Sequence, residues 1–171
     1  GRSAGMGGSG SRRGTMSAEG DRVQDGALTT LAWLRKAEIQ PRKAWGQNFL
    51  INARVAERMV ARWALSAGDG VLEIGAGAGS LTLPLLARGA AVVAVERDPR
   101  LCCLLRERAA REAGASPLRV CCGDILEVDP IAEIETFQRE LAAAGRRPPG
   151  QWVLVGNLPY RFTAPILEWA V

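Results

Sequence analysis

The chain has 171 residues, of which 47% are hydrophobic and 23% are charged. This length and composition are typical of one globular domain with a buried core. No stretch approaches the ~20 consecutive apolar residues that a membrane-spanning helix needs, and the first residues lack the apolar segment of a secretory signal. We therefore expect a cytoplasmic protein.

Histidine is absent, which excludes Ser-His-Asp and Cys-His catalysis and argues against a zinc site. The four cysteines form two adjacent pairs, Cys102 with Cys103 and Cys121 with Cys122, and neither pair has CxxC spacing. We expect them to be small, buried, unpaired side chains in a reducing compartment, with no metal bound.

The net charge of +4 is concentrated at the start of the chain. Residues 1–47 hold eight Lys and Arg against four Asp and Glu, whereas residues 48–171 hold fourteen of each. A basic leading segment could bind a nucleic-acid backbone. Charge alone, however, favours the interpretation that this segment is a tail that only aids solubility. Residues 1–26 are rich in Gly, Ser and Arg, and we expect them to be disordered.

Helices and strands are expected to alternate after this tail. A short helix over 28–38 is followed by the loop "QPRKAWGQNFLIN" and by a second helix over 53–65, whose face is formed by Val55, Met59, Val60 and Trp63. The four expected strands are "GVLEI", "AAVVAVE", "PLRVCC" and "QWVLV". The later helices are "SLTLPLLARG", "DPRLCCLLRERAAREAG" with Asp98 as its N-cap, "DPIAEIETFQRELAAAG" and the final "TAPILEWAV".

Continuous apolar strands that alternate with helices predict an α/β fold with a parallel, doubly wound sheet. Residues 27–171 are expected to be the N-terminal part of one such domain, truncated after the fourth strand. The missing neighbours would leave apolar surface exposed beside that strand.

Ligands of doubly wound folds bind outside the carboxyl ends of the strands. The first strand leads into "LEIGAGAGSLT", where Gly75 and Gly77 allow close approach of the backbone to a ligand. The spacing is G-x-G-x-G, whereas the dinucleotide fingerprint is G-x-G-x-x-G. Glu73 disfavours a nearby phosphate but suits S-adenosylmethionine, which has no phosphate and carries positive charge. A dinucleotide loop and a plain tight turn remain the alternatives.

Two further acidic residues end the next strands. Glu96 follows the glycine loop by about twenty residues, and a carboxylate there can accept hydrogen bonds from both ribose hydroxyls. Asp124, in "CCGDIL", could accept a hydrogen bond from an adenine amino group, although an Asp at this position is as often a cap.

The fourth strand leads into "GNLPY". Methyl transfer to a planar exocyclic amine is helped by acceptors for its two hydrogens, which the Asn157 side chain and a backbone carbonyl of Leu158 or Pro159 could supply. Tyr160, the only tyrosine, could stack on the target base. The alternative is an ordinary strand-to-helix turn, in which Asn and Pro are common.

The segments "KAWGQNFL", "LEIGAGAGSLT", "VERD", "GDIL" and "VGNLPYRFTAPIL" resemble, in order and spacing, the ribosomal RNA adenine N6,N6-dimethyltransferases. The resemblance runs from about Pro41 to the end and is strongest to the bacterial small-subunit (16S) type. It implies a Rossmann-like class I methyltransferase fold and S-adenosyl-L-methionine as cofactor. It also implies a monomer without metal that acts on rRNA or a small ribosomal subunit precursor.

The resemblance also implies roles for individual residues. The donor-binding set is Gln47, Asn48, Leu50, Gly75, Gly77, Glu96, Asp124 and Asn157, and the catalytic set is Asn157, Leu158, Pro159 and Tyr160. The chain departs from the family pattern at Trp45, where Phe is usual, at Ala76, where Pro is common, and at Arg161 and Phe162, which follow "NLPY".

Four alternatives to this reading remain. A large-subunit rRNA methyltransferase of the antibiotic-resistance type shares "QNF" but commonly has "NIPY". A DNA adenine methyltransferase usually carries a "DPPY"-like motif. A non-catalytic RNA-binding assembly or transcription factor on the same fold would not need an intact "NLPY". A nicotinamide oxidoreductase is disfavoured by the glycine spacing.

Overall fold

The computed structural model describes residues 29–40 and 52–156. The elements in chain order are α1 (Thr30–Lys36), α2 (Ala53–Arg62), β1 (Gly70–Ile74), α3 (Thr82–Ala87), β2 (Ala91–Glu96), α4 (Pro99–Glu112), β3 (Leu118–Cys122), α5 (Pro130–Ala143) and β4 (Trp152–Gly156). The expected basic tail, the "GQNFL" and "NLPY" segments and the final helix lie outside the described residues.

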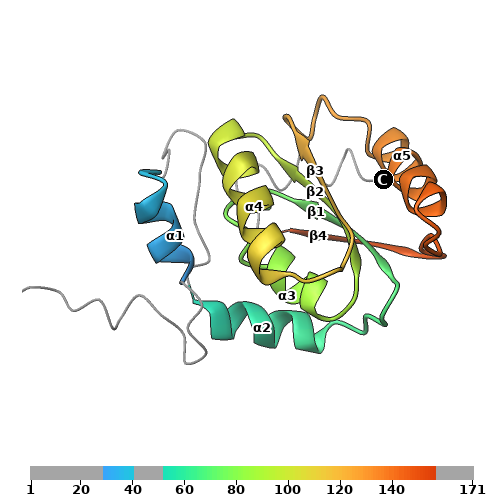
Figure 1. The fold of residues 1–171 in the computed structure, drawn as a ribbon, viewed down its shortest axis with the longest axis horizontal. Coiled ribbons are helices and arrows are strands. Elements are labelled where there is room, and N and C mark those ends of the chain that lie inside the picture. Colours follow the sequence, from blue (N-terminus) through green and yellow to red (C-terminus); the bar gives the residue numbers. More distant parts are fainter. Residues whose placement is uncertain (1–28, 41–51, 157–171) are drawn as a thin grey trace, which may run out of the picture.

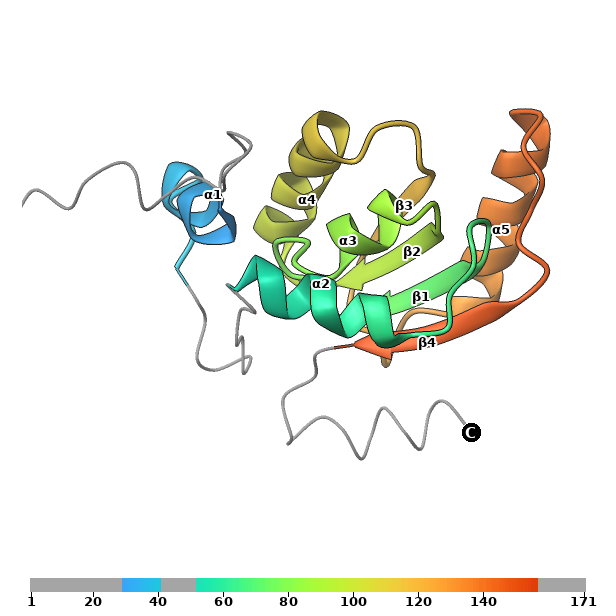
Figure 2. The same ribbon diagram turned by 90° about the horizontal axis from the view of Figure 1, so that it is seen from below.

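The four strands form one parallel sheet in the order β3-β2-β1-β4 (Figure 1). Because the chain runs outward from β1 through β2 to β3 and then returns to the other side of β1, the strand order reverses between β1 and β4. Helices α2, α3 and α4 pack on one face, and α5 packs on the other (Figures 1 and 2). The predicted doubly wound parallel sheet is therefore confirmed.

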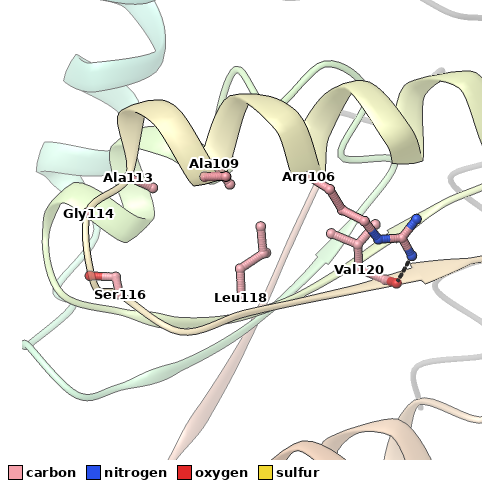
Figure 3. Close-up of a pocket in the computed structure, with 8 residues that line it drawn as sticks. Arg106, Ala109, Ala113, Gly114, Ser116, Leu118 and Val120 are labelled. Atoms are coloured by element: carbon pink, nitrogen blue, oxygen red, sulfur yellow. Dashed lines mark hydrogen bonds between the residues drawn. The ribbon is translucent and has the colours of Figure 1, made fainter.

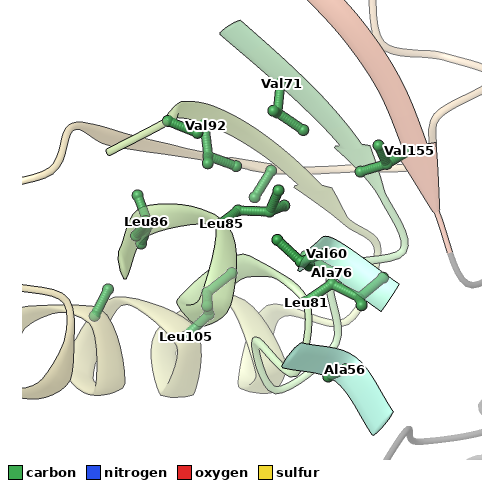
Figure 4. Packing of buried hydrophobic residues seen from close by; sticks show 13 residues of the cluster. Ala56, Val60, Val71, Ala76, Leu81, Leu85, Leu86, Val92, Leu105 and Val155 are labelled. Atoms are coloured by element: carbon green, nitrogen blue, oxygen red, sulfur yellow. The ribbon is translucent and has the colours of Figure 1, made fainter. Parts of the chain in front are cut away.

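The larger core lies between the sheet and helices α2, α3 and α4 (Figure 4). Val71 and Val92 from the sheet, Leu85 from α3 and Leu105 from α4 have no exposed surface. On the opposite face, Phe137 and its neighbours on α5 cover the sheet. The sheet residues in this second cluster include Leu72, Ile74, Val93 and Val95. Both faces of the central strands are buried, which explains why these strands are apolar throughout.

Polar caps set where the longer helices begin. Asp98 accepts a hydrogen bond from the Arg100 backbone N–H at 3.0 Å, as predicted, and Asn52 and Asp129 cap α2 and α5 in the same way. The helix expected in "SLTLPLLARG" is limited to Thr82–Ala87 because the glycine loop occupies the residues before it. Helix α2 ends at Arg62, three residues earlier than expected.

The buried face of α2 differs from the predicted one. Ala56 and Val60 have no exposed surface, whereas Val55, which the sequence placed on the apolar face, is 41% exposed. Ala56 and Val60 belong to the buried cluster between the sheet and the helices (Figure 4). The spacing of large apolar residues therefore located the helix but misassigned one position of its face.

The prediction that all four cysteines are buried and unpaired was wrong except for Cys121. Cys102, in the first turns of α4, and Cys122, at the end of β3, form a disulfide. Cys121 is buried and Cys103 is exposed. Successive residues point in opposite directions on a strand and about 100° apart on a helix. The two thiols of each adjacent pair therefore point into different surroundings. Cys102 from the first pair and Cys122 from the second point toward each other and form the disulfide.

Strand β4 lies at one edge of the sheet described here, and part of its surface is uncovered. Val153 is 36% exposed and Leu154 is 43% exposed. Leu154 pairs with Leu72 of β1, which is buried, so the uncovered surface continues the apolar face of the sheet. The predicted exposure of apolar surface beside the fourth strand is confirmed for these residues.

Gly70 and Trp152 give a first prediction about packing. The two residues are partners in the β1–β4 register, and a Cβ added to Gly70 would lie 2.4 Å from the Trp152 indole. The Gly70→Ala variant should therefore lower the free energy of unfolding by roughly 1–3 kcal/mol in urea titrations. The double variant Gly70→Ala, Trp152→Leu should be less destabilised than the two single changes summed, and strict additivity would contradict this packing.

Candidate functional site

The candidate site lies at the carboxyl ends of β1, β2 and β3, beside the reversal of strand order at β4. A glycine loop follows β1, Glu96 ends β2, and Asp124 lies two residues beyond β3. Parallel strands bring these three features to one edge of the sheet, which is where doubly wound folds bind ligands. The sequence prediction that these strand ends lie together is confirmed.

The glycine loop adopts a conformation that depends on its glycines. Gly75, Gly77 and Gly79 have φ values of 70°, 57° and 87°, a region that residues with a Cβ rarely occupy. The Gly75 N–H donates to the carbonyl oxygen of Val95 at 2.9 Å, which ties the start of the loop to β2. A Cβ on Gly79 would lie 2.6 Å from Cδ1 of Leu105, so helix α4 packs closely against the end of the loop.

Glu96 connects the loop to the start of α4. Its Oε2 accepts a hydrogen bond from the Gly77 N–H at 2.8 Å, and its Oε1 accepts one from the Asp98 N–H at 2.8 Å. Burial raises the pKa of Glu96, and these two backbone bonds oppose that rise. A carboxylate has about four acceptor positions. The Arg97 backbone N–H also interacts with this carboxylate, and Glu96 retains acceptor capacity for a ligand hydroxyl.

Glu73 lies on β1 just before the loop and is 2% exposed. Its Oε2 is 2.6 Å from the Thr82 Oγ1, at the start of α3. Burial raises the pKa of Glu73 to about 8, and the negative charge of Glu96 adds to the rise. Glu73 is therefore largely protonated at neutral pH and joins β1 to α3 beneath the loop. The sequence prediction that a negative charge on Glu73 acts on the ligand is thus wrong.

Asp124 occupies the third strand end and is already partnered. Its Oδ1 accepts a hydrogen bond from the Leu126 N–H at 3.1 Å, and its Oδ2 lies 3.3 Å from a guanidinium nitrogen of Arg97. The side chain is 26% exposed, so a ligand can reach it. Asp124 caps no helix, since the N-cap of α5 is Asp129, and its bond to Leu126 instead closes a turn after β3. These contacts leave acceptor positions open for an amino group.

Sequence reasoning missed one residue at the site. Arg108 of α4 is 4% exposed and donates a hydrogen bond to the Ala78 carbonyl oxygen in the loop, at 2.7 Å. No local pattern distinguishes it, because Arg106, Arg108 and Arg111 all lie in a helix rich in charge. The predicted residues Gln47, Asn48, Leu50 and Asn157, Leu158, Pro159 and Tyr160 lie outside the described residues.

A second surface feature lies apart from the candidate site. A shallow groove of about 320 Å³ runs between α4 and β3, on the side of the amino-terminal half of that strand (Figure 3). Arg106 donates to the Val120 carbonyl oxygen at 2.7 Å beside it.

Within residues 29–40 and 52–156, His, Cys, Asp and Glu form no group of three that could hold a metal ion. No helix in that part is long and apolar enough to cross a membrane.

The site residues fit a donor that carries a ribose and an adenine but no phosphate. The carboxylates of Glu96 and Asp124 supply acceptors, and negative charge at the loop is unfavourable for a phosphate. The loop N–H of Gly77 is itself bonded to Glu96, so it is not available to a phosphate as in a dinucleotide loop. The geometry therefore favours S-adenosyl-L-methionine over NAD.

Comparison with known proteins identifies the family of the chain. A family model described as ribosomal RNA adenine dimethylase matches residues 39–171. The small-subunit rRNA methyltransferase A of Magnetococcus marinus is 41% identical over 134 residues, which are 78% of this chain and 43% of that protein. The corresponding protein of Mycobacterium tuberculosis is 38% identical over 78% of this chain and 38% of its own length.

Two solved structures have the same fold. The 23S rRNA methyltransferase ErmE has a TM-score of 0.53 and 30% identity, over 71% of this chain and 42% of that one. A dimethyladenosine transferase from Plasmodium falciparum has a TM-score of 0.51 and 25% identity, over 68% and 36%. The fold is thus the Rossmann-like class I methyltransferase fold, and the chain spans under half the length of these relatives. The chain belongs to the ribosomal RNA adenine dimethylase family.

Proposed function

We propose that the protein of which this chain forms part is an S-adenosyl-L-methionine-dependent enzyme that dimethylates adenine N6 in small-subunit (16S) rRNA. It would act in the cytoplasm as a monomer, on a precursor of the small ribosomal subunit. The observation that carries this proposal is the glycine loop held by Glu96 at the strand ends, within a chain 41% identical to a small-subunit rRNA methyltransferase.

The described residues would hold the donor through its nucleoside. Glu96 would accept hydrogen bonds from the two ribose hydroxyls, and Asp124 would accept one from the adenine amino group. Gly75 and Gly77 would let the backbone approach the donor, since a Cβ is unfavourable at their φ values. Gln47, Asn48 and Leu50 complete the proposed donor-binding set.

The proposed catalytic residues would act on the target amine. Bound S-adenosyl-L-methionine supplies an electrophilic methyl group, which leaves a neutral thioether on transfer. The Asn157 side-chain oxygen, with a carbonyl of Leu158 or Pro159, would accept the two amine hydrogens and make the nitrogen more nucleophilic. Tyr160 would stack on the base and fix its direction of approach. The methylated nitrogen would then release one proton to solvent, and no ionisable nucleophile of the protein is needed.

The experiment that tests this function uses the full-length protein and labelled S-adenosyl-L-methionine. Small ribosomal subunits from a strain that lacks the N6 methylation should gain two methyl groups per target adenine, and large-subunit RNA should gain none. Methylation confined to large-subunit RNA would support the alternative of a large-subunit rRNA methyltransferase. The similarity to ErmE is the observation that favours this alternative. Calorimetric preference for NAD over S-adenosyl-L-methionine would contradict both.

A further inference from the structure

Arg108 is a buried charge whose donors are distributed among three parts of the fold. Nη1 donates to the Ala78 carbonyl oxygen at 2.7 Å and to the Thr30 hydroxyl at 3.2 Å. Nε and Nη2 each lie 3.3 Å from a carboxylate oxygen of Glu112, on the next turn of α4. The guanidinium thus connects the glycine loop, helix α1 and helix α4 at one point.

Helix α1 packs on the same region. Trp33, Leu34 and Ile39 are buried against Ala78 of the loop and against α4 residues Leu101 and Leu104. The Arg108 guanidinium carbon lies 5.9 Å from the centroid of the Trp33 ring, within the range of a cation–π contact. A hydrophobic contact and a charged contact therefore both join α1 to the loop.

The contact with Arg108 holds a buried carbonyl group of the glycine loop. Ala78 is 2% exposed, so its carbonyl oxygen would be buried without a partner if Arg108 were absent. The preceding residue, Gly77, donates its N–H to Glu96 on the other side. Two charged side chains, one from β2 and one from α4, thus hold two peptide groups of the loop that are separated by a single peptide group.

We propose that Arg108 is a positioning residue for the methyl-donor loop, and that α1 acts with it to keep the loop in its donor-binding conformation. This inference rests on the donor site proposed above. The family model begins its match at residue 39, after the end of α1 at Lys36. The inference therefore gives a role in donor binding to a segment that the family match does not include.

The test compares two arginines of the same helix in the full-length protein. Arg108→Met removes the loop contact and keeps much of the apolar stem, whereas the matched control Arg106→Met removes a bond to β3 beside the groove of Figure 3. By calorimetry, Arg108→Met should bind S-adenosyl-L-methionine about tenfold more weakly, since a buried carbonyl loses its partner. Arg106→Met should bind it as the wild type does.

Kinetics separate positioning from a general loss of stability. At a temperature where every variant is folded, Arg108→Met should raise KM for the donor about tenfold and leave kcat at saturating donor within about threefold. Arg108→Lys should recover part of the affinity because an ammonium can still reach one carbonyl oxygen. Thr30→Val removes only the hydroxyl from α1 and should weaken binding by about threefold.

The possible outcomes are distinguishable. A folded Arg108→Met protein with wild-type donor affinity would overturn the inference. If that variant does not fold, unchanged donor affinity in both Thr30→Val and Arg108→Lys would overturn it. Wild-type protein that binds the donor but does not methylate rRNA contradicts the proposed function alone, and the comparison of donor affinities still decides the role of Arg108. Wild-type protein that does not bind the donor contradicts both.

Discussion

Replacing Glu96 by alanine should weaken S-adenosyl-L-methionine binding by about two orders of magnitude. Its carboxylate accepts the N–H groups of Gly77 and Asp98 at 2.8 Å each, and it is the proposed acceptor for the ribose hydroxyls. An unsatisfied buried N–H costs about 1–3 kcal/mol, and lost charge-assisted bonds to the ligand add to this. A total of about 3 kcal/mol corresponds to roughly a 150-fold change in Kd.

The isosteric change Glu96→Gln is the more informative variant. A glutamine amide offers one acceptor oxygen, and its NH₂ group would face either the Gly77 or the Asp98 N–H. Two hydrogen-bond donors would then face each other without an acceptor. The affinity of Glu96→Gln for S-adenosyl-L-methionine should therefore fall nearly as far as that of Glu96→Ala. Glu135→Gln, on an exposed position of α5, is the matched control and should bind normally. Calorimetry that finds Glu96→Gln within threefold of wild type would contradict the acceptor role.

The fold was predictable because its strands are buried on both faces and its helices begin at strong caps. Runs such as "AVVAV" are apolar without alternation, which a parallel sheet covered on both sides requires. A doubly wound sheet implies that the strand order reverses, but the alternation of strands and helices does not show between which strands. The order β3-β2-β1-β4 could therefore not be read from that pattern. The short length of α3 was also missed, because loop residue Leu81 is buried as a helical residue would be.

The placement of the candidate site residues was predictable where they end a strand, and unpredictable where it depends on tertiary contact. Gly75, Gly77 and Glu96 are marked by their positions relative to strands. Arg108 is marked by nothing local, because its burial depends on α1, which lies more than seventy residues earlier in the chain. The Cys102–Cys122 disulfide was missed for the same reason, since it joins α4 to the end of β3.

Stability should fall as the pH rises from about 5 to 8, and Glu73→Gln should remove much of that fall. Burial raises the pKa of Glu73 from 4.5 to about 8. Between these values the folded protein holds a proton that the unfolded chain has released, so the unfolded state binds fewer protons. The free energy of unfolding then decreases with pH by up to about 1.4 kcal/mol per unit.

Glutamine removes the titration while it keeps an oxygen that can accept a hydrogen bond from the Thr82 hydroxyl. Urea unfolding of the full-length protein at pH 5, 6, 7 and 8 should therefore show wild type and Glu73→Gln close together at pH 5. The variant should be the more stable of the two at pH 8, by roughly a few kcal/mol. Some slope should remain in the variant, because burial also raises the pKa of Glu96.

Glu133→Gln is the control with the opposite sign. The Arg119 guanidinium, 2.7 Å away, lowers the pKa of Glu133, so this carboxylate contributes stability that is fully present above the unfolded value and is lost only as the pH falls through the folded one. Across pH 5 to 8 its removal should shift the stability curve without changing the slope. If the curves of wild type and Glu73→Gln also run parallel across this range, Glu73 is ionised in the folded protein, and the neutral link between β1 and α3 beneath the loop is wrong.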